Sequence, residues 1–173
     1  MAGPKLQDPY FGESVLLICE YNHNGALGFI INKATNVEVN EVLRQCDLPT
    51  RDVPKASLWG GPVGQGSVFI LFEGSVPQEE GWNIELPEHP IAVGTSVSII
   101  EKLIEEDTGF EIVLGYSGWG PGQLDREIQT GSWLYSDLSP DILLSLPSKD
   151  RYEFAIEHLG LQKEKIWMNP IDE

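Results

Sequence analysis

The residues of this chain best suited to chemistry gather in one glycine-rich stretch, residues 110–134, which contains Ser117, Gln123 and Glu127. Three glycines alternate there with bulky residues; they are Gly118, Gly120 and Gly122. Glycine tolerates positive φ and close backbone approach, so the spacing predicts a sharp, ordered turn that leads from a strand into a short helix. Free N–H groups at the start of a helix can hold a carboxylate or a phosphate. The stretch is therefore a candidate site for a small anion-bearing ligand.

Three known motifs come close to this stretch, and none of them matches it. A nucleophile elbow requires Gly-x-Ser-x-Gly, whereas Ser117 is followed directly by Gly118 and Trp119. The spacing is Gly-x-Gly-x-Gly rather than the Gly-x-Gly-x-x-Gly of a dinucleotide fingerprint, and no lysine lies between Lys102 and Lys149 to complete a phosphate loop. A purely structural interpretation also stays open, in which the glycines only let Trp119 fold back into the core.

The acid–base inventory of the chain is thin. None of the three histidines lies at ligand spacing from another histidine or from a cysteine; they are His23, His89 and His158. Each is expected to be an exposed or internally satisfied side chain. Asp125 and Glu127 point to different faces of the predicted helix, so they form no obvious catalytic pair. We therefore expect no catalytic residues, no metal site and no cofactor.

Composition and charge exclude several classes of function. The chain has 173 residues, with 27 acidic against 11 basic side chains and a formal net charge of −16. Such a surface repels phosphate backbones, whose binding depends on Lys and Arg, so direct nucleic-acid binding is not expected. The two cysteines, Cys19 and Cys46, form no Cys-x-x-Cys motif and are expected to be core residues. Without a leader or an apolar run of membrane length, the sequence predicts a cytoplasmic protein with no membrane contact.

The elements that must position the glycine-rich stretch follow from apolar periodicity and turn residues. A strand over residues 110–116 leads into a helix that begins at Pro121, places Leu124 and Ile128 on one face and stops before Gly131. Other expected strands span residues 14–20, 26–31, 57–59, 67–72, 91–93 and 132–135, and other expected helices span residues 40–46, 96–106, 142–146 and 151–159. Irregular segments are expected at residues 1–13, an N-terminal arm, at residues 74–90, and in a tail over residues 161–173.

Two further groups of residues are candidates for the same site. A second glycine-rich turn, around Gly60 and Gly61, is hypothesised to abut the turn at Trp119, so that two backbone-lined walls form one cleft. Asn32 ends a predicted strand, and its amide either caps a turn or faces a pocket. In the tail, the apolar run 166–168 is expected to pack on a neighbouring element or on a second chain.

Several blocks of residues also follow one another in a distinctive order along most of the chain. The longest block runs from Gly115 to Leu124 and continues with Glu127-Ile128 and Trp133-Leu134. The others are Asp8-x-x-Phe11, the run from Gly25 to Lys33, Gly60-Gly61-Pro62-Val63, and Tyr152-x-x-Ala155 with Leu159-Gly160. On these blocks the sequence resembles the YqgE/AlgH family.

The resemblance implies a single α+β domain over residues 1–173, with a bent and branched, mainly antiparallel sheet that forms a partial barrel flanked by short helices. The resemblance brings no established biochemical activity with it, although family members are labelled transcriptional regulators after one member linked to alginate control. This chain departs from the family at Phe72, where many members carry histidine, and at Tyr152, where many carry tryptophan. A role that depends on that histidine does not transfer to this chain.

Two classes of function remain from the sequence. The favoured one is a non-enzymatic binding or regulatory protein that contacts an unknown protein or small molecule, because no titratable groups converge on the glycine-rich turn in the sequence. The other is an unrecognised hydrolase or transferase that acts on a small anionic substrate at the turn from Gly118 to Gln123. The candidate ligand- or partner-binding residues are Tyr116, Ser117, Gly118, Trp119, Gly120, Gln123, Glu127, Asn32, Gly60 and Gly61. The sequence predicts no oligomeric state.

Overall fold

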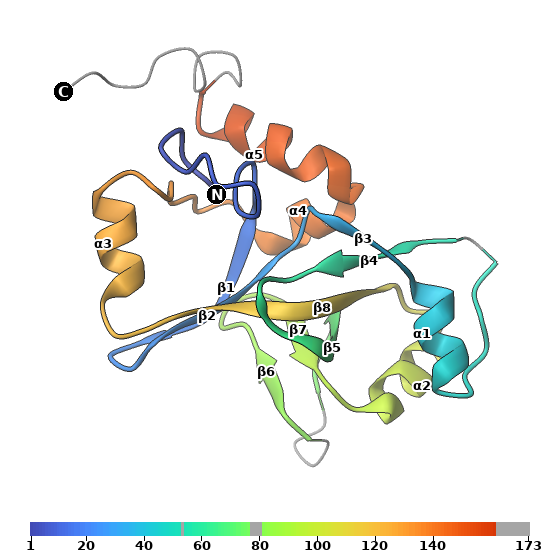
Figure 1. The fold of residues 1–173 in the computed structure, drawn as a ribbon. Helices are drawn as coiled ribbons and strands as arrows, with labels where there is room; N and C mark the ends of the chain where they lie inside the picture. The colour runs from blue at the N-terminus through green and yellow to red at the C-terminus, as the bar shows by residue number, and fades with distance from the viewer. Residues whose placement is uncertain (53, 77–80, 162–173) are drawn as a thin grey trace.

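The computed structural model describes residues 1–52, 54–76 and 81–161 (Figure 1). The strands are β1 (Leu16–Asn22), β2 (Gly25–Ile30), β3 (Ala34–Glu38), β4 (Ala56–Trp59), β5 (Val63–Glu73), β6 (Asn83–Glu85), β7 (Ile91–Gly94) and β8 (Phe110–Trp119). The helices are α1 (Val39–Gln45), α2 (Val97–Glu105), α3 (Gln123–Gln129), α4 (Pro140–Ser145), the 3₁₀ turn η1 (Ser148–Asp150) and α5 (Arg151–His158). The strands and short helices together make a mixed α+β fold.

The strands form one bent, branched sheet that nearly closes into a barrel (Figure 1). Along the main path the order is β1-β2-β8-β5-β7-β6, and every neighbouring pair on this path is antiparallel. Strand β4 branches from this path, because it pairs antiparallel with β3 and parallel with β8. Helices α1 and α2 cover one end of the sheet, α3 lies at the opposite end, and α4 and α5 lie beside β1. The α+β fold with a mainly antiparallel partial barrel is therefore confirmed.

Strand β8 is the hub of this sheet because it changes partners along its length. Its first half pairs with β5 and, at Val113 and Leu114, with β4, whereas Ser117 to Trp119 pair with β2. Gly115 lies at the change of partner with a φ of +71°, in the left-handed region that side chains disfavour. One strand thus connects the β1–β2 hairpin to the rest of the sheet.

The extent of β8 corrects the predicted turn. The sequence predicts a strand that ends at Tyr116, followed by a turn that starts at Gly118. In the structure the strand continues to Trp119, because pairing with β2 outweighs the low strand propensity of glycine. The turn is confined to residues 120–122, and α3 begins at Gln123 rather than at Pro121.

Other elements differ from expectation in smaller ways. Strands β3 and β6 are not among the predicted strands, and residues 132–135 contain one isolated bridge instead of a strand. Helix α2 begins at Val97, one residue later than predicted, and the preceding Ser96 makes no side-chain cap bond. Val97 is exposed, although its helical spacing predicts a core position, because the buried face of α2 is centred on its neighbours two and three residues later. The apolar run 166–168 lies outside the described residues.

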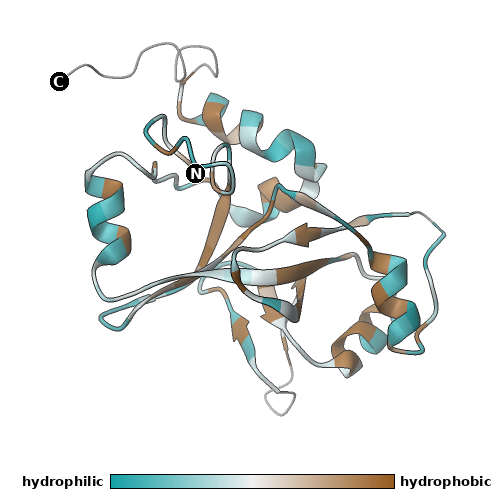
Figure 2. Cartoon of the chain, in the orientation of Figure 1, coloured by the Kyte–Doolittle hydropathy of each residue, from teal (hydrophilic) through white to brown (hydrophobic). Residues whose placement is uncertain are grey.

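Strand β1 lies between two apolar clusters of the described residues, and the first part of its ribbon is coloured hydrophobic in Figure 2. Val15 and Leu17 point into the main core, which also holds Leu143 and Ala155 from α4 and α5. Leu16 and Ile18 point the other way, against a smaller cluster around Trp119, Leu124 and Trp133. The third cluster packs α1 and α2 on the far half of the sheet. Both faces of the first half of β1 are therefore apolar, which explains the apolar run over residues 16–19; the strand becomes polar and exposed from Glu20 onward.

A buried arginine ties α5 to the sheet. The side chain of Arg151 is 1 % exposed, and its guanidinium lies 2.6 Å from Glu111 Oε1 on β8. The same guanidinium donates to the carbonyls of Ile31 (2.5 Å) and Leu146 (3.1 Å). A buried charge requires partners of this kind, since removal of one member of a buried ion pair typically costs about 3–5 kcal/mol.

Candidate functional site

The two glycine-rich blocks of the sequence meet in space, but at the strand that precedes the predicted turn. A Cβ added to Gly60 would lie 2.2 Å from the carbonyl oxygen of Gly115, and one added to Gly61 would lie 2.3 Å from that of Tyr116. The hydroxyl of Ser117 donates to the carbonyl of Gly60 at 3.0 Å. We call this contact the glycine joint. The two backbones touch so closely that no side chain fits between them, so the joint is a packed crossing and not a cleft.

The residues after the turn form a second closed arrangement, which we call the Glu127 clasp. One carboxylate oxygen of Glu127 accepts the indole N–H groups of Trp119 (2.8 Å) and Trp133 (2.9 Å). Its other oxygen accepts the amide of Gln123 at 2.9 Å, and Gln123 in turn accepts the backbone N–H of Gly120. Trp119 is only 8 % exposed, and its ring packs edge-on against Trp133 with centroids 6.1 Å apart. The clasp fixes α3 against the end of β8.

The remaining predicted site residues also have internal partners. Asn32 accepts the N–H of Val15 at 2.7 Å and donates to the carbonyl of Glu13 at 2.8 Å, so its amide fixes the arm before β1. The ring of Tyr116 packs edge-on against Phe69, with centroids 6.0 Å apart. The structure thus divides the predicted site into three separate contacts, and it places Gly118, Gly120 and the outer edge of Gln123 at the surface. A ligand-binding role for any of them stays a prediction.

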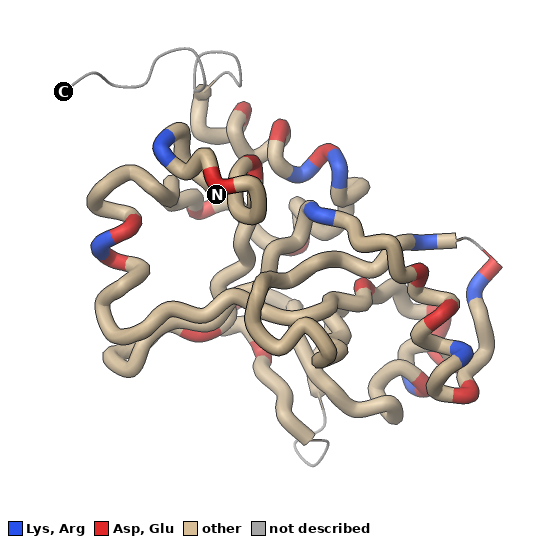
Figure 3. The backbone as a smooth tube through the Cα atoms, viewed as in Figure 1, with Lys and Arg blue, Asp and Glu red and all other residues tan. Residues whose placement is uncertain are grey.

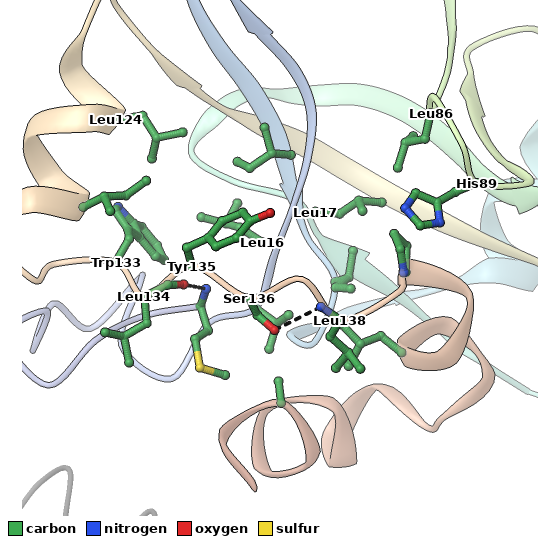
Figure 4. Close-up of a pocket in the computed structure, with 18 of the residues that line it drawn as sticks. Leu16, Leu17, Leu86, His89, Leu124, Trp133, Leu134, Tyr135, Ser136 and Leu138 are labelled. Atoms are coloured by element: carbon green, nitrogen blue, oxygen red, sulfur yellow. Dashed lines mark hydrogen bonds between the residues drawn. The ribbon is translucent and has the colours of Figure 1, made fainter. Parts of the chain in front are cut away.

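A cavity of about 280 Å³ lies next to the Glu127 clasp and runs along β1 (Figure 4). We call it the edge slot. At one end its wall comes from Leu124 and Trp133, and at the other from Leu86, His89 and Leu138; Leu16 and Leu17 of β1 lie between these ends. Segment 134–138 forms the opposite wall, where the ring of Tyr135 lies across β1 and is 76 % exposed. The lining is mostly apolar and the cavity opens to solvent.

The backbone of β1 faces the edge slot with unpaired polar groups. In an antiparallel ladder, residues bond to the neighbouring strand at every second position. Ile31 N donates to Val15 O at 3.0 Å, so Val15 and, two residues on, Leu17 bond toward β2. Ile30 lies opposite Leu16 and donates its N–H to Gly60 O, on the side of β2 that faces away from β1. Leu16 and Ile30 therefore form a pair that is not hydrogen-bonded, which agrees with this alternation. The N–H and C=O groups of Leu16 and Ile18 therefore point away from β2, and β1 has no second neighbouring strand at these positions among the described residues.

The chain itself already uses this edge one step earlier. Ala2 N donates to Ser14 O at 2.7 Å, and Ala2 also forms the isolated antiparallel bridge with Trp133. Ala2 thus lies between Ser14, two residues before β1, and Trp133. Met1 pairs with Leu134 and lines the beginning of the edge slot. The slot continues the line of this pairing past Leu16 and Ile18. A further extended segment would lie in the same line.

The His89 end of the edge slot is its most polar part. His89 Nδ1 lies 3.3 Å from the hydroxyl oxygen of Ser139 and 4.0 Å from Asp141 Oδ1. The hydroxyl of Ser139 donates to Asp141 Oδ1. This bond, helped by the backbone N–H of Asp141 itself, lowers the pKa of Asp141 below its usual value, so the carboxylate is ionised at neutral pH. The other ring nitrogen of His89 faces the slot (Figure 4).

Sequence reasoning missed the edge slot. The apolar run at Leu16 and Ile18 predicts a strand buried on both faces, which is correct, but nothing in it indicates that one edge lacks a partner. His89 is isolated in the sequence, and its partners come from a helix about 50 residues later. Tyr135 lies in a segment predicted to be a strand, although it is irregular and borders the slot.

Acidic and basic residues of the described part of the chain are interspersed, and the view in Figure 3 shows no stripe of basic residues. Basic side chains are scattered among a larger number of acidic ones, which agrees with the net charge of −16. Within residues 1–52, 54–76 and 81–161, no cluster of His, Cys, Asp and Glu is suited to hold a metal ion. Over the same residues, every helix is too short or too polar to cross a bilayer.

The sheet that nearly closes into a barrel is the fold of AlgH-like proteins. The family model described as AlgH-like matches residues 1–164, and the chain belongs to this family. A UPF0301 protein of Vibrio vulnificus is 35% identical over 175 residues, with 96% of this chain and 92% of the relative covered. A UPF0301 protein of Shewanella loihica is 34% identical, with 96% and 90% covered.

Two solved structures share the fold. The solution structure of the AlgH protein from Pseudomonas aeruginosa superposes with a TM-score of 0.74 at 30% identity and covers 100% of this chain and 93% of that one. A crystal structure of a Corynebacterium diphtheriae protein gives a TM-score of 0.70 at 21% identity, with 97% and 87% covered. The family resemblance seen in the sequence is therefore confirmed. None of these names states an activity.

Proposed function

We propose that this protein is a non-enzymatic binding protein, and that it holds an extended segment of a partner protein in the edge slot. The observation that carries the proposal is the unpaired edge of β1, where the N–H and C=O groups of Leu16 and Ile18 face an apolar cavity. An extended peptide pairs with such an edge through main-chain hydrogen bonds, and pockets for alternate side chains give the specificity. The unpaired groups of Leu16 and Ile18 are the two positions at which a peptide can bond. A strand that bonds at both would pair over about three to five residues, at about 3.3 Å per residue.

The two ends of the slot supply those pockets. Side chains of a paired strand alternate between the two faces of the sheet. One set would lie toward Leu124 and Trp133, where Leu16 and Ile18 already point, and the other toward Leu86 and Leu138. The occupant is therefore an extended segment with apolar residues at alternate positions. Pairing in line with Ala2 would extend a contact that the fold already makes.

Charge and site chemistry support binding over the alternatives. A net charge of −16 with scattered basic residues opposes direct contact with nucleic-acid phosphates. The hydroxyl of Ser117, the nucleophile nearest the predicted turn, is 2 % exposed and donates to Gly60. A hydrolase or transferase at that turn would have to release this bond first. A regulatory role would follow from whichever partner supplies the segment.

Peptide selection tests the proposal. Random heptapeptides displayed on phage are selected on the full chain and counter-selected on Leu16→Pro. Proline removes one N–H that points into the slot, and an edge strand tolerates proline where its N–H would face outward. Leu16→Ala is the matched control, because it loses the same side chain but keeps the N–H. The selected peptides are expected to alternate apolar residues and to bind Leu16→Pro at least about tenfold more weakly than Leu16→Ala, the scale of one lost hydrogen bond with a steric clash.

A second measurement does not depend on a folded proline variant. A selected peptide is expected to slow hydrogen exchange at the amides of Leu16 and Ile18 in the wild-type protein. Peptides that bind the two Leu16 variants equally, peptides that protect other amides, or a selection that yields no binder would each overturn the proposal.

A further inference from the structure

His89 is the one imidazole that borders the edge slot, and its hydrogen-bond partners fix which nitrogen carries the proton. The ionised carboxylate of Asp141 only accepts hydrogen bonds, so the single hydroxyl hydrogen of Ser139 points to Asp141. The oxygen of Ser139 is then left to accept from His89 Nδ1, 3.3 Å away. Nδ1 therefore carries a hydrogen, and in the neutral ring Nε2 is the unprotonated nitrogen.

This unprotonated nitrogen faces the slot (Figure 4). In the neutral ring it is an acceptor without a hydrogen of its own, placed at the edge of an apolar cavity. Across the slot, the phenol of Tyr135 is largely exposed and makes no hydrogen bond within the described residues. The occupant of the slot is the partner available to Nε2.

We propose that His89 is a specificity-determining residue of the edge slot, and that its Nε2 accepts a hydrogen bond from an N–H donor on the bound segment, preferably a lysine. This inference rests on the proposed function. Lysine is preferred over neutral donors because the surroundings are negative: Asp141 lies 4.0 Å from the far side of the ring, and the protein carries a net charge of −16. A segment with alternating apolar residues and one lysine at the His89 end would satisfy every part of the slot.

The inference has a consequence for pH. Histidines titrate between about pH 5 and 8, and protonation turns Nε2 from an acceptor into a donor and adds a positive charge. The charged or titratable groups of the slot are Asp141 from α4, Tyr135 from segment 134–138 and the α-amino group of Met1, with Glu88 adjacent to His89 in the chain. Burial lowers the pKa of the Met1 amine to about 6. Strand β1 presents only apolar side chains to the slot. Protonation of the ring therefore weakens the binding of a lysine-bearing segment, and protonation of the Met1 amine, which also lines the slot, acts in the same direction.

The test uses a heptapeptide from the selection described above that carries a lysine, and a copy with norleucine at that position. At pH 8 the lysine peptide is expected to bind the wild-type protein about tenfold more tightly than the norleucine peptide, and this advantage is expected to shrink on acidification. In His89→Leu the lysine peptide is expected to lose its advantage at pH 8. In His89→Gln, whose amide oxygen still accepts, the advantage is expected to remain and to change less with pH than in the wild-type protein. His23→Gln, in the exposed turn between β1 and β2 and outside the lining of the slot, is the matched control and keeps the wild-type profile.

A spectroscopic readout separates this role from a structural one. Ring-nitrogen NMR of the wild-type protein at pH 8 is expected to show the Nδ1–H tautomer for His89, and Ser139→Ala is expected to abolish that preference. Peptides that bind the slot with no lysine preference and an unchanged pH profile in His89→Leu would overturn this inference and leave strand addition intact. Absence of any slot-dependent peptide would instead overturn the proposed function on which it rests.

Discussion

The glycine joint and the edge slot lie on either side of strand β2, and they use the backbone in opposite ways. At the joint, Gly60 O accepts from both Ile30 N and the hydroxyl of Ser117, and the strands touch without space for a side chain. At the slot, the polar groups of Leu16 and Ile18 face a cavity of about 280 Å³. The most distinctive residues of the sequence therefore mark the tightest packing of the fold. The open edge is marked by ordinary leucines and isoleucines.

The largest expected effect comes from a methyl group placed in the joint. Gly61 has a φ of +150°, and a Cβ there would lie 2.3 Å from Tyr116 O. Gly61→Ala combines backbone strain with overpacking, so the free energy of unfolding is expected to fall by about 3 kcal/mol or more. Gly66→Ala is the matched control, since no atom lies within 4 Å of its added Cβ; its effect is expected to stay under about 1 kcal/mol. Urea denaturation measures both, and equal effects would mean that the joint is not packed as described.

The clasp comes next in size. Glu127→Gln keeps the shape but removes the charge that accepts two indole N–H groups. Hydrogen bonds to charged groups contribute about 1.5–3 kcal/mol, so a loss of about 2 kcal/mol is expected in the free energy of unfolding. Glu105→Gln, at the exposed end of α2, is the control and is expected to be nearly neutral. A stable Glu127→Gln variant with unchanged tryptophan fluorescence would argue that the clasp does not hold α3.

A smaller effect is the pH dependence of stability that comes from the face of β1 that points into the main core, in contrast to its open edge. Burial, with help from the charge of Glu20, raises the pKa of the Cys19 thiol to about 12 from a usual 9. The folded state therefore keeps a proton that the unfolded state loses above pH 9, and stability falls as the pH rises. Between pH 8 and pH 10 this loss is expected to reach about 1.4 kcal/mol, and to be absent in Cys19→Val. Urea denaturation of both proteins at alkaline pH measures this loss of stability. A loss in the wild-type protein no larger than that in Cys19→Val would show that water reaches the thiol.

The smallest effect concerns exchange and not stability. In the unbound protein, the amides of Leu16 and Ile18 are expected to exchange with solvent deuterium faster than the amide of Leu17, because only Leu17 bonds toward β2. Amide-resolved NMR measures the three rates. Equal protection at all three positions would show that another segment already occupies the edge, and it would remove the basis of the slot.

The family blocks of the sequence predicted the α+β fold and the partial barrel, and apolar periodicity located most of the strands and helices. The sequence predicted that β8 ends at Tyr116, whereas the strand continues to Trp119. Local reasoning could not find this, because Gly118 becomes a strand residue only through its pairing with β2. The edge slot could not be predicted for a related reason. The sequence of a strand does not indicate that one of its edges lacks a neighbouring strand. Nor does it indicate the contact between His89 and Ser139, which lie 50 positions apart in the chain.

The change of partner at Gly115 also bears on how the molecule can be divided. The β1–β2 hairpin and the β5–β7–β6 sheet never pair with each other directly along the main path, and both depend on β8 for their inner edge. A fragment that ends before residue 110 would lack β8, so β2 and β5 would each have an unpaired edge instead of joining in one sheet. We therefore expect the protein to melt in a single step, and neither half to survive expression without the other.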